Sequence, residues 1–135
     1  MIRSDIIRRI QSYLNTAYNG PITILAEEDE GDLTPPCAVV RISSSEDLGA
    51  NQAIVWDMNV IVGVFHDADD DTIETAEQQA EDLFAYLNDT TVTSAYLNSG
   101  GFQTSVWRPI TIEASREETR WQHFQTYHLI IAPGF

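Results

Sequence analysis

Residues 53–66 constrain the fold of this chain more than any other segment, because apolar side chains alternate along nearly their whole length. One face is apolar throughout, with Ile54, Trp56, Met58, Val60, Val62 and Val64. The opposite face is polar only near its start, at Asp57 and Asn59. Alternation with a period of two indicates a β-strand, and a second face that becomes apolar indicates cover on both sides. We therefore predict a long central strand here.

Two other segments carry the spacing of an amphipathic helix. Residues 4–18 place an apolar stripe on one side, made of Ile6, Ile7, Ile10, Leu14 and Ala17, and Gly20 and Pro21 follow as a stop. Residues 72–88 are the clearer case, with a stripe of Ile73, Ala76, Ala80, Leu83, Phe84 and Leu87. We predict that both helices pack on the sheet.

The remaining strands are predicted from shorter apolar runs, at residues 22–26, 37–43, 102–114 and 120–134. Pro109 lacks a backbone donor, which places its strand at an edge or next to a bulge. Residues 89–101 are β-leaning but rich in turn formers, and residues 43–52 suit a hairpin connection or a flexible arm. The order predicts one domain over residues 1–135, of the α+β class. Its antiparallel or mixed sheet has about four to five strands, with two α-helices packed on one face.

The charge balance is strongly acidic. The chain has 21 Asp and Glu residues against 7 arginines and no lysine, for a formal net charge of −14. Such a surface repels DNA phosphates and anionic membranes, so a general nucleic-acid binder and a membrane-surface protein are both disfavoured. An acidic partner surface, a cation, or a channel through which DNA passes without sticking are all compatible with this charge.

The segment FHDADDDT, residues 65–72, concentrates four acids at the junction between the central strand and the second helix. A calcium loop needs glycine at its sixth position and glutamate at its twelfth, where this chain has Thr72 and Gln78. Helix capping explains the run better, since Asp71 or Thr72 can cap and Glu74 follows Asp71 at capping-box spacing. The other acids suit the positive end of the helix dipole. We expect no dedicated metal site, and weak divalent binding stays open.

Catalytic patterns are missing from the sequence. His123 and His128 are an odd number of positions apart, so one strand presents them on opposite faces. Cys37 is the only cysteine, which excludes an internal disulfide, and its apolar neighbours suggest a small buried side chain. No nucleophile elbow, zinc-binding helix or phosphate loop occurs. We expect neither catalytic residues nor a cofactor.

Aromatic and arginine residues cluster in the last third of the chain. Residues of these types dominate protein–protein contacts, so we predict a subunit or partner interface at Trp107, Arg108, Arg116, Arg120 and Trp121. The alternative is that the aromatic rings belong to the core. Concentrated arginines on an acidic protein give an asymmetric surface, which suits head-to-tail contact between the positive patch of one copy and the negative patch of another.

The chain opens with a predicted helix and continues through an acidic loop before TPPCAVVRI, a long alternating strand, the helix TIETAEQQAEDLFAYLND, and the closing strand RWQHFQTYHLIIAPG. This layout resembles the tail terminator, or tail completion, proteins of long-tailed bacteriophages. The resemblance implies a structural virion protein that forms a hexameric ring on the tail tube and stops polymerisation of the tube protein. It also implies a surface for the head-side connector and a lumen through which the genome passes.

If the resemblance holds, the two acidic loops are candidates for facing the lumen or a neighbouring subunit, through Glu27, Glu28, Asp29, Glu30, Asp67, Asp69 and Asp70. DNA then passes without specific binding. Two other classes stay open, a different head–tail connector or stopper protein and an acidic DNA mimic that inhibits a nucleic-acid enzyme. Arginines interrupt the N-terminal apolar pattern, so we expect no signal peptide and no membrane association. The expected location is the host cytoplasm during assembly and then the virion.

Overall fold

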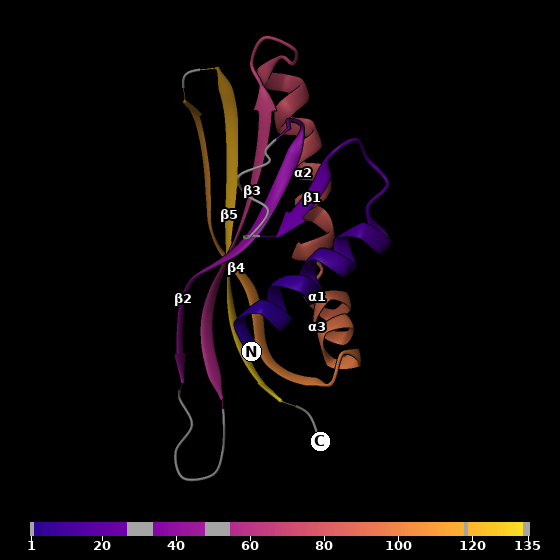
Figure 1. Ribbon diagram of the computed structural model, residues 1–135, viewed down its shortest axis with the longest axis vertical. Helices are drawn as coiled ribbons and strands as arrows, with labels where there is room; N and C mark the ends of the chain where they lie inside the picture. Colours follow the sequence, from indigo (N-terminus) through magenta and orange to yellow (C-terminus); the bar gives the residue numbers. More distant parts are fainter. Residues whose placement is uncertain (1, 27–33, 48–54, 118, 134–135) are drawn as a thin grey trace.

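The computed structural model describes residues 2–26, 34–47, 55–117 and 119–133, and confirms the α+β class. In this described part three helices, α1 (Ile2–Ala17), α2 (Ile73–Asn88) and α3 (Thr90–Ser99), accompany five strands (Figure 1). The strands are β1 (Thr23–Ala26), β2 (Cys37–Asp47), β3 (Trp56–Asp67), β4 (Phe102–Glu117) and β5 (Arg120–Pro133).

One mixed sheet holds all five strands in the order β1-β2-β3-β5-β4. β1 pairs with β2 in parallel, and every other neighbouring pair is antiparallel. The predicted central strand is confirmed, since β3 lies between β2 and β5. β2 is longer than predicted and continues through Asp47 with a register shift between Ile42 and Ser44. Residues 48–54 lie outside the described part.

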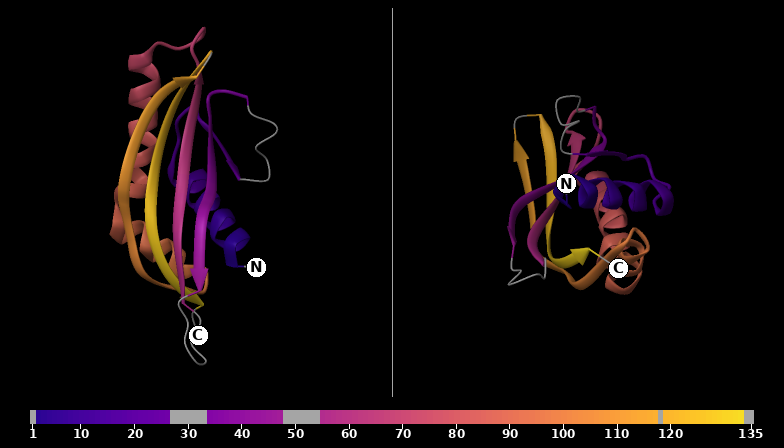
Figure 2. Two further views of the ribbon diagram at one scale, coloured as in Figure 1. Left: turned by 90° about the vertical axis from the view of Figure 1, so that its left-hand side faces the viewer. Right: turned by 60° about the horizontal axis from the view of Figure 1, so that its bottom comes forward.

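All three helices cover the same face of the sheet, which we call the helix face (Figure 2). α1 packs on β1 and β2, α2 on β3 and β5, and α3 on β4. Alternate residues of β3 and β5 point into this layer and are buried, including Met58, Val60, Val62, Val64, Tyr127, Leu129 and Ile131. The predicted apolar stripes of the first two helices pack against them, with the exception of Ile73, which is 48% exposed. Each such side chain contributes roughly 1.5–3 kcal/mol when fully buried, so this layer is the main core.

The third helix is a correction to the sequence analysis, which assigned residues 89–101 to a turn-rich connection. The Asp89 side chain caps α3 by accepting from the Val92 amide. Thr93 is buried, and its hydroxyl contacts the carbonyl oxygens of Tyr86 and Leu87 at the end of α2. Leu97 is buried in the main core. Capping and packing therefore outweigh the β-propensity of the threonine- and valine-rich sequence.

The strand β4 forms one edge of the sheet, as Pro109 predicts. Its pairing with β5 shifts register between Thr104 and Val106 and again between Pro109 and Thr111. The second shift surrounds the proline, so edge position and bulge are both confirmed. From residue 108 onward every described position of β4 is exposed.

The other face of the sheet, the open face, carries a smaller apolar cluster of Cys37, Val39 and Phe65 with Leu25 and Phe124 packed against it. The rings of Phe65 and Phe124 meet edge to face at 5.7 Å. Gly63 lies beneath Phe124, and a Cβ there would approach that ring to 2.7 Å. Cys37 is a buried free thiol, and burial raises its pKa. No helix of the described residues is both long and apolar enough to cross a membrane.

Candidate assembly surface

The structure brings the acid run close to two of the predicted arginines, Arg116 and Arg120, at one end of the sheet, which we call the hairpin end. The third, Arg108, lies farther along β4, opposite His128. Asp67 lies opposite Arg120 in the β3–β5 register, and the Ala68 amide donates to the Thr119 carbonyl at 2.7 Å. The Trp121 indole donates to the Asp71 carbonyl at 3.0 Å. Opposite charges are therefore neighbours within one chain. The described part of the predicted acidic patch, Asp67, Asp69 and Asp70, therefore lies at the same end of the sheet as Arg116 and Arg120.

The acid run itself forms a turn and a helix cap. The side chain of Asp67 accepts from the Asp69 amide at 2.9 Å, and the carbonyl of Asp67 accepts from the amides of Asp70 and Asp71. The Thr72 hydroxyl caps α2 by accepting from the Thr75 amide at 3.2 Å. The prediction of Thr72 as a cap is confirmed.

The predicted capping box between Asp71 and Glu74 is wrong, because Thr72 is the cap and Thr75 occupies the position three residues later. Glu74 lies in the first turn of the helix, where its charge still favours the dipole. Within the described part of the chain, no group of three or more His, Cys, Asp or Glu side chains is arranged to hold a metal ion. The other acidic loop, with Glu27, Glu28, Asp29 and Glu30, lies outside the described residues.

The five predicted interface residues separate into two groups. Trp107 is only 4% exposed, stacks on Tyr127 at 4.6 Å, and donates from its indole to the Leu87 carbonyl at 2.8 Å. Its assignment to an interface is wrong, and the alternative, a core ring, is correct. The others lie at the surface: Arg108 and Arg116 are exposed, and Arg120 and Trp121 are half-buried. The Arg116 guanidinium lies 4.9 Å from the centre of the Trp121 ring.

The sequence analysis missed a groove between α2 and β4, the α2–β4 groove, of about 300 Å³. Its apolar lining comes from Ile73, Ala80 and Phe84 on the helix and from Ile112 and Ala114 on the strand. Ile112 is 73% exposed and Ile73 is 48% exposed. Both are large apolar side chains at the rim of one depression, which is typical of a contact surface.

Two buried polar residues of β5 also line the α2–β4 groove. Gln125 is 1% exposed, and its side-chain amide donates to Asn88 at 3.0 Å while its Oε1 has no partner among the described residues. The Nδ1 atom of His123 is likewise unpartnered there, and burial lowers the pKa of this histidine. The sequence does contain a signal for these two residues. His123 and Gln125 are polar positions on the strand face that is otherwise apolar at Tyr127, Leu129 and Ile131. His128 lies on the open face beside Asp57, at 2.8 Å.

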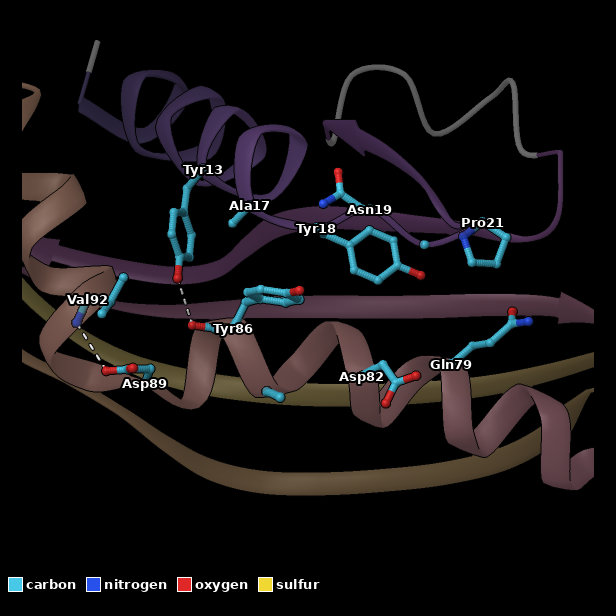
Figure 3. Close-up of a pocket in the computed structure, with 12 residues that line it drawn as sticks. Tyr13, Ala17, Tyr18, Asn19, Pro21, Gln79, Asp82, Tyr86, Asp89 and Val92 are labelled. Atoms are coloured by element: carbon cyan, nitrogen blue, oxygen red, sulfur yellow. Dashed lines mark hydrogen bonds between the residues drawn. The ribbon is translucent and has the colours of Figure 1, made fainter.

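A second depression, the tyrosine hollow, lies between the end of α1 and α2 and measures about 700 Å³ (Figure 3). Tyr13 donates to the Tyr86 carbonyl at 2.9 Å, and the rings of Tyr18 and Tyr86 meet edge to face at 6.1 Å. Burial raises the pKa of Tyr13 and of Tyr18, so both phenols stay protonated at neutral pH. Asp89, at its rim, is occupied in capping α3. The hollow presents aromatic surface without an acid–base pair.

The described surface of this α+β fold combines an exposed strand edge with apolar depressions, which are features typical of surfaces that contact other chains. A solved structure titled "Virion of native gene transfer agent (GTA) particle" contains a chain with this fold, at a TM-score of 0.55 and 11% sequence identity. The alignment covers 96% of the present chain and 95% of that one.

Residues 5–106 match the family profile described as "Phage tail terminator protein", and the chain belongs to this family. The predicted family is thereby confirmed. The match begins inside α1 and ends in the first part of β4, so it includes most of α1 and all of α2 and α3. No curated protein matches the chain. The protein is a structural component of a phage tail.

Proposed function

We propose that this protein caps the end of the phage tail tube as a hexameric ring, stops further addition of tube protein, and presents the surface to which the head-side connector joins. The family match over residues 5–106 carries this proposal. The exposed length of β4 supports it, because a strand edge that no other strand covers in the described part offers both backbone groups and side chains to a neighbouring chain.

The net charge suits a role on the path of the genome. At −14 the protein repels phosphate, so DNA that passes through such a ring is not retained. Asp69 and Asp70 are exposed at the hairpin end, and Asp67 beside them is half-buried. We place these three acids, together with Glu27, Glu28, Asp29 and Glu30, on the lumen or on the subunit contact.

The test is a reconstitution with the purified tail tube protein of the same phage. Tubes polymerised with this protein should stop growing and should carry a six-fold ring at one end, seen by electron microscopy, while tubes polymerised alone continue to lengthen. The capped tubes should then join connector-bearing heads. Unchanged growth in the presence of a molar excess of the protein would contradict the proposal.

A further inference from the structure

The helix layer leaves the second half of β4 without cover. α3 packs on β4, and the β4 residues that belong to the main core, Phe102 and Trp107, lie in its first half. Residues 108–117 are exposed, and the α2–β4 groove opens beside them with the side chains of Ile73 and Ile112 at its rim. Covering these side chains removes apolar surface from water, so the groove favours an occupant with an apolar side chain of its own.

Two buried residues that line the same groove have polar atoms without a partner in the described part of the chain, Gln125 at Oε1 and His123 at Nδ1. The amide nitrogen of Gln125 donates to Asn88 Oδ1, which also accepts from the Tyr127 hydroxyl. Its oxygen is therefore the atom left without a hydrogen bond. Because a buried carbonyl oxygen without a donor is unfavourable, a fitting occupant brings a hydrogen-bond donor.

The charges at the α2–β4 groove are negative. Glu77 and Glu81 line it and are exposed, and no arginine is among the described residues that line it. α2 itself has no basic residue. A complementary occupant therefore presents Lys or Arg next to its apolar side chain.

The chain itself is a poor source of this basic group. It has no lysine, and five of its seven arginines interact with other groups of their own chain, namely Arg3, Arg8, Arg9, Arg41 and Arg116. Arg120 is half-buried opposite Asp67, and Arg108 lies opposite His128 on the open face. A basic segment of another protein therefore fits the groove better than a second copy does.

The order of assembly favours the tail tube protein over the connector as this other protein. In the proposed function the tube is bound first, and the connector joins only the capped tube. An apolar groove that stays open in solution promotes non-specific association. The groove is therefore better suited to the partner that covers it first.

We infer that the α2–β4 groove receives a segment of the tail tube protein that places a large apolar side chain between Ile73 and Ile112. The same segment brings a hydrogen-bond donor to Gln125 Oε1 and a Lys or Arg to Glu77 and Glu81. This inference rests on the proposed function and names the surface of the chain that holds the tube. The acids add specificity, because they repel the acidic surface of a second copy.

The apolar part of the contact is tested by Ile112→Asp, which should cap about tenfold fewer tube ends than wild type. Val92→Asp is the matched control, since Val92 is 49% exposed on α3, outside the groove, and should leave capping unchanged. Circular dichroism verifies that all variants are folded. Equal capping by Ile112→Asp and wild type overturns the inference and leaves the proposed function in place. Failure of wild type to cap any tube overturns both.

The charged part is tested by Glu77→Gln combined with Glu81→Gln, which should lower capping about threefold and make it less sensitive to added salt. The control combines Asp82→Asn with Glu113→Gln, which removes the same charge from exposed positions outside the groove and should cap like wild type. Equal capping by the two double variants would mean that the acids of the groove have no special part, and would overturn the inference.

The occupant is identified by photocrosslinking. Ile112→p-benzoylphenylalanine places a photoreactive ring at a position that is 73% exposed. Irradiation of capped tubes should link this residue to the tube protein, and mass spectrometry should find Lys or Arg close to a large apolar residue in the linked peptide. A link to a second copy of this chain, or to a tube peptide without a basic residue, overturns the inference.

Discussion

Trp107 and Trp121 have the same chemistry but different tasks in this protein. Trp107 joins β4 to the end of α2 through its stacked contact with Tyr127 and its bond to the Leu87 carbonyl. Trp121 is half-buried at the hairpin end, with its indole on the Asp71 carbonyl and Arg116 beside its ring. The first ring therefore contributes to the core, and the second stays a predicted contact for a partner.

We expect Trp107→Ala to lower the free energy of unfolding by about 3–5 kcal/mol, since it empties a buried site and removes the donor from the Leu87 carbonyl. Trp121→Ala should lower it by less, because that ring is already half in water. Urea denaturation of both variants, followed by circular dichroism, measures the difference. Equal losses would contradict the assignment of Trp107 to the core.

His123 makes stability depend on pH. Burial lowers its pKa and the nearby His66 lowers it further, while Glu77 and Glu81 act in the opposite direction. The unfolded chain therefore takes up a proton near pH 6.5, at the ordinary pKa of histidine, and the folded chain takes it up only at lower pH. Stability from this group is complete above that pH and declines as the pH falls below it, by at most about 1.4 kcal/mol per pH unit.

The variant His123→Gln tests this dependence. Thermal unfolding of wild type and variant between about pH 7.5 and 5.5 should show the smaller decline for the variant. Both proteins keep the same carboxylates and the other two histidines, so the difference reports His123 together with its interaction with His66. Parallel curves would show that its protonation is not linked to folding.

Among the elements, α2 begins at Thr72, one of the two residues that the sequence predicts as its cap. Thr72→Ala removes the acceptor for the Thr75 amide and should lower the free energy of unfolding by about 1 kcal/mol. Asp71→Ala is the control, because Asp71 contacts Trp121 through its backbone carbonyl, which the substitution keeps. Chemical denaturation compares the two. A larger loss of unfolding free energy for Asp71→Ala would show that Asp71, and not Thr72, is the cap of α2.

Elements with a regular apolar period could be predicted from sequence, and elements formed by tertiary contacts could not. β3 and α2 have one dominant period each, so their type and position follow directly. α3 is rich in β-branched residues and has no regular apolar period that would predict a helix. It is stabilised instead by the Asp89 cap and by the contact of the Thr93 hydroxyl with the end of α2. The α2–β4 groove depends on the bulge at Pro109 and on Gln125 lying opposite Ile112, and both are facts of register.

At the scale of the whole molecule, the hairpin end combines exposed acids with arginines. The triple variant Asp67→Asn, Asp69→Asn and Asp70→Asn keeps the size of each side chain and the oxygen at position 67 that the Asp69 amide contacts. We expect the free energy of unfolding to change by less than about 1 kcal/mol, because these positions lie at the surface. We expect assembly or DNA passage to change, since the charges rather than the fold are altered.

Phage infectivity and the yield of joined heads and tails measure the effect of this triple variant. Glu113→Gln on β4 is a control, because it removes an exposed acid away from the hairpin end. Normal assembly and normal infectivity of the triple variant would mean that these acids serve only to hydrate the surface.

The burial of Cys37 also makes the protein chemically simple to label. Its thiol lies inside the small cluster of the open face, and burial raises its pKa, so little reactive thiolate forms at neutral pH. A cysteine placed at an exposed position of α2 is then the dominant reactive thiol of each subunit, since the sequence contains no second cysteine. Fluorophores attached at such a site would report the spacing of subunits during tail maturation without prior removal of native cysteines.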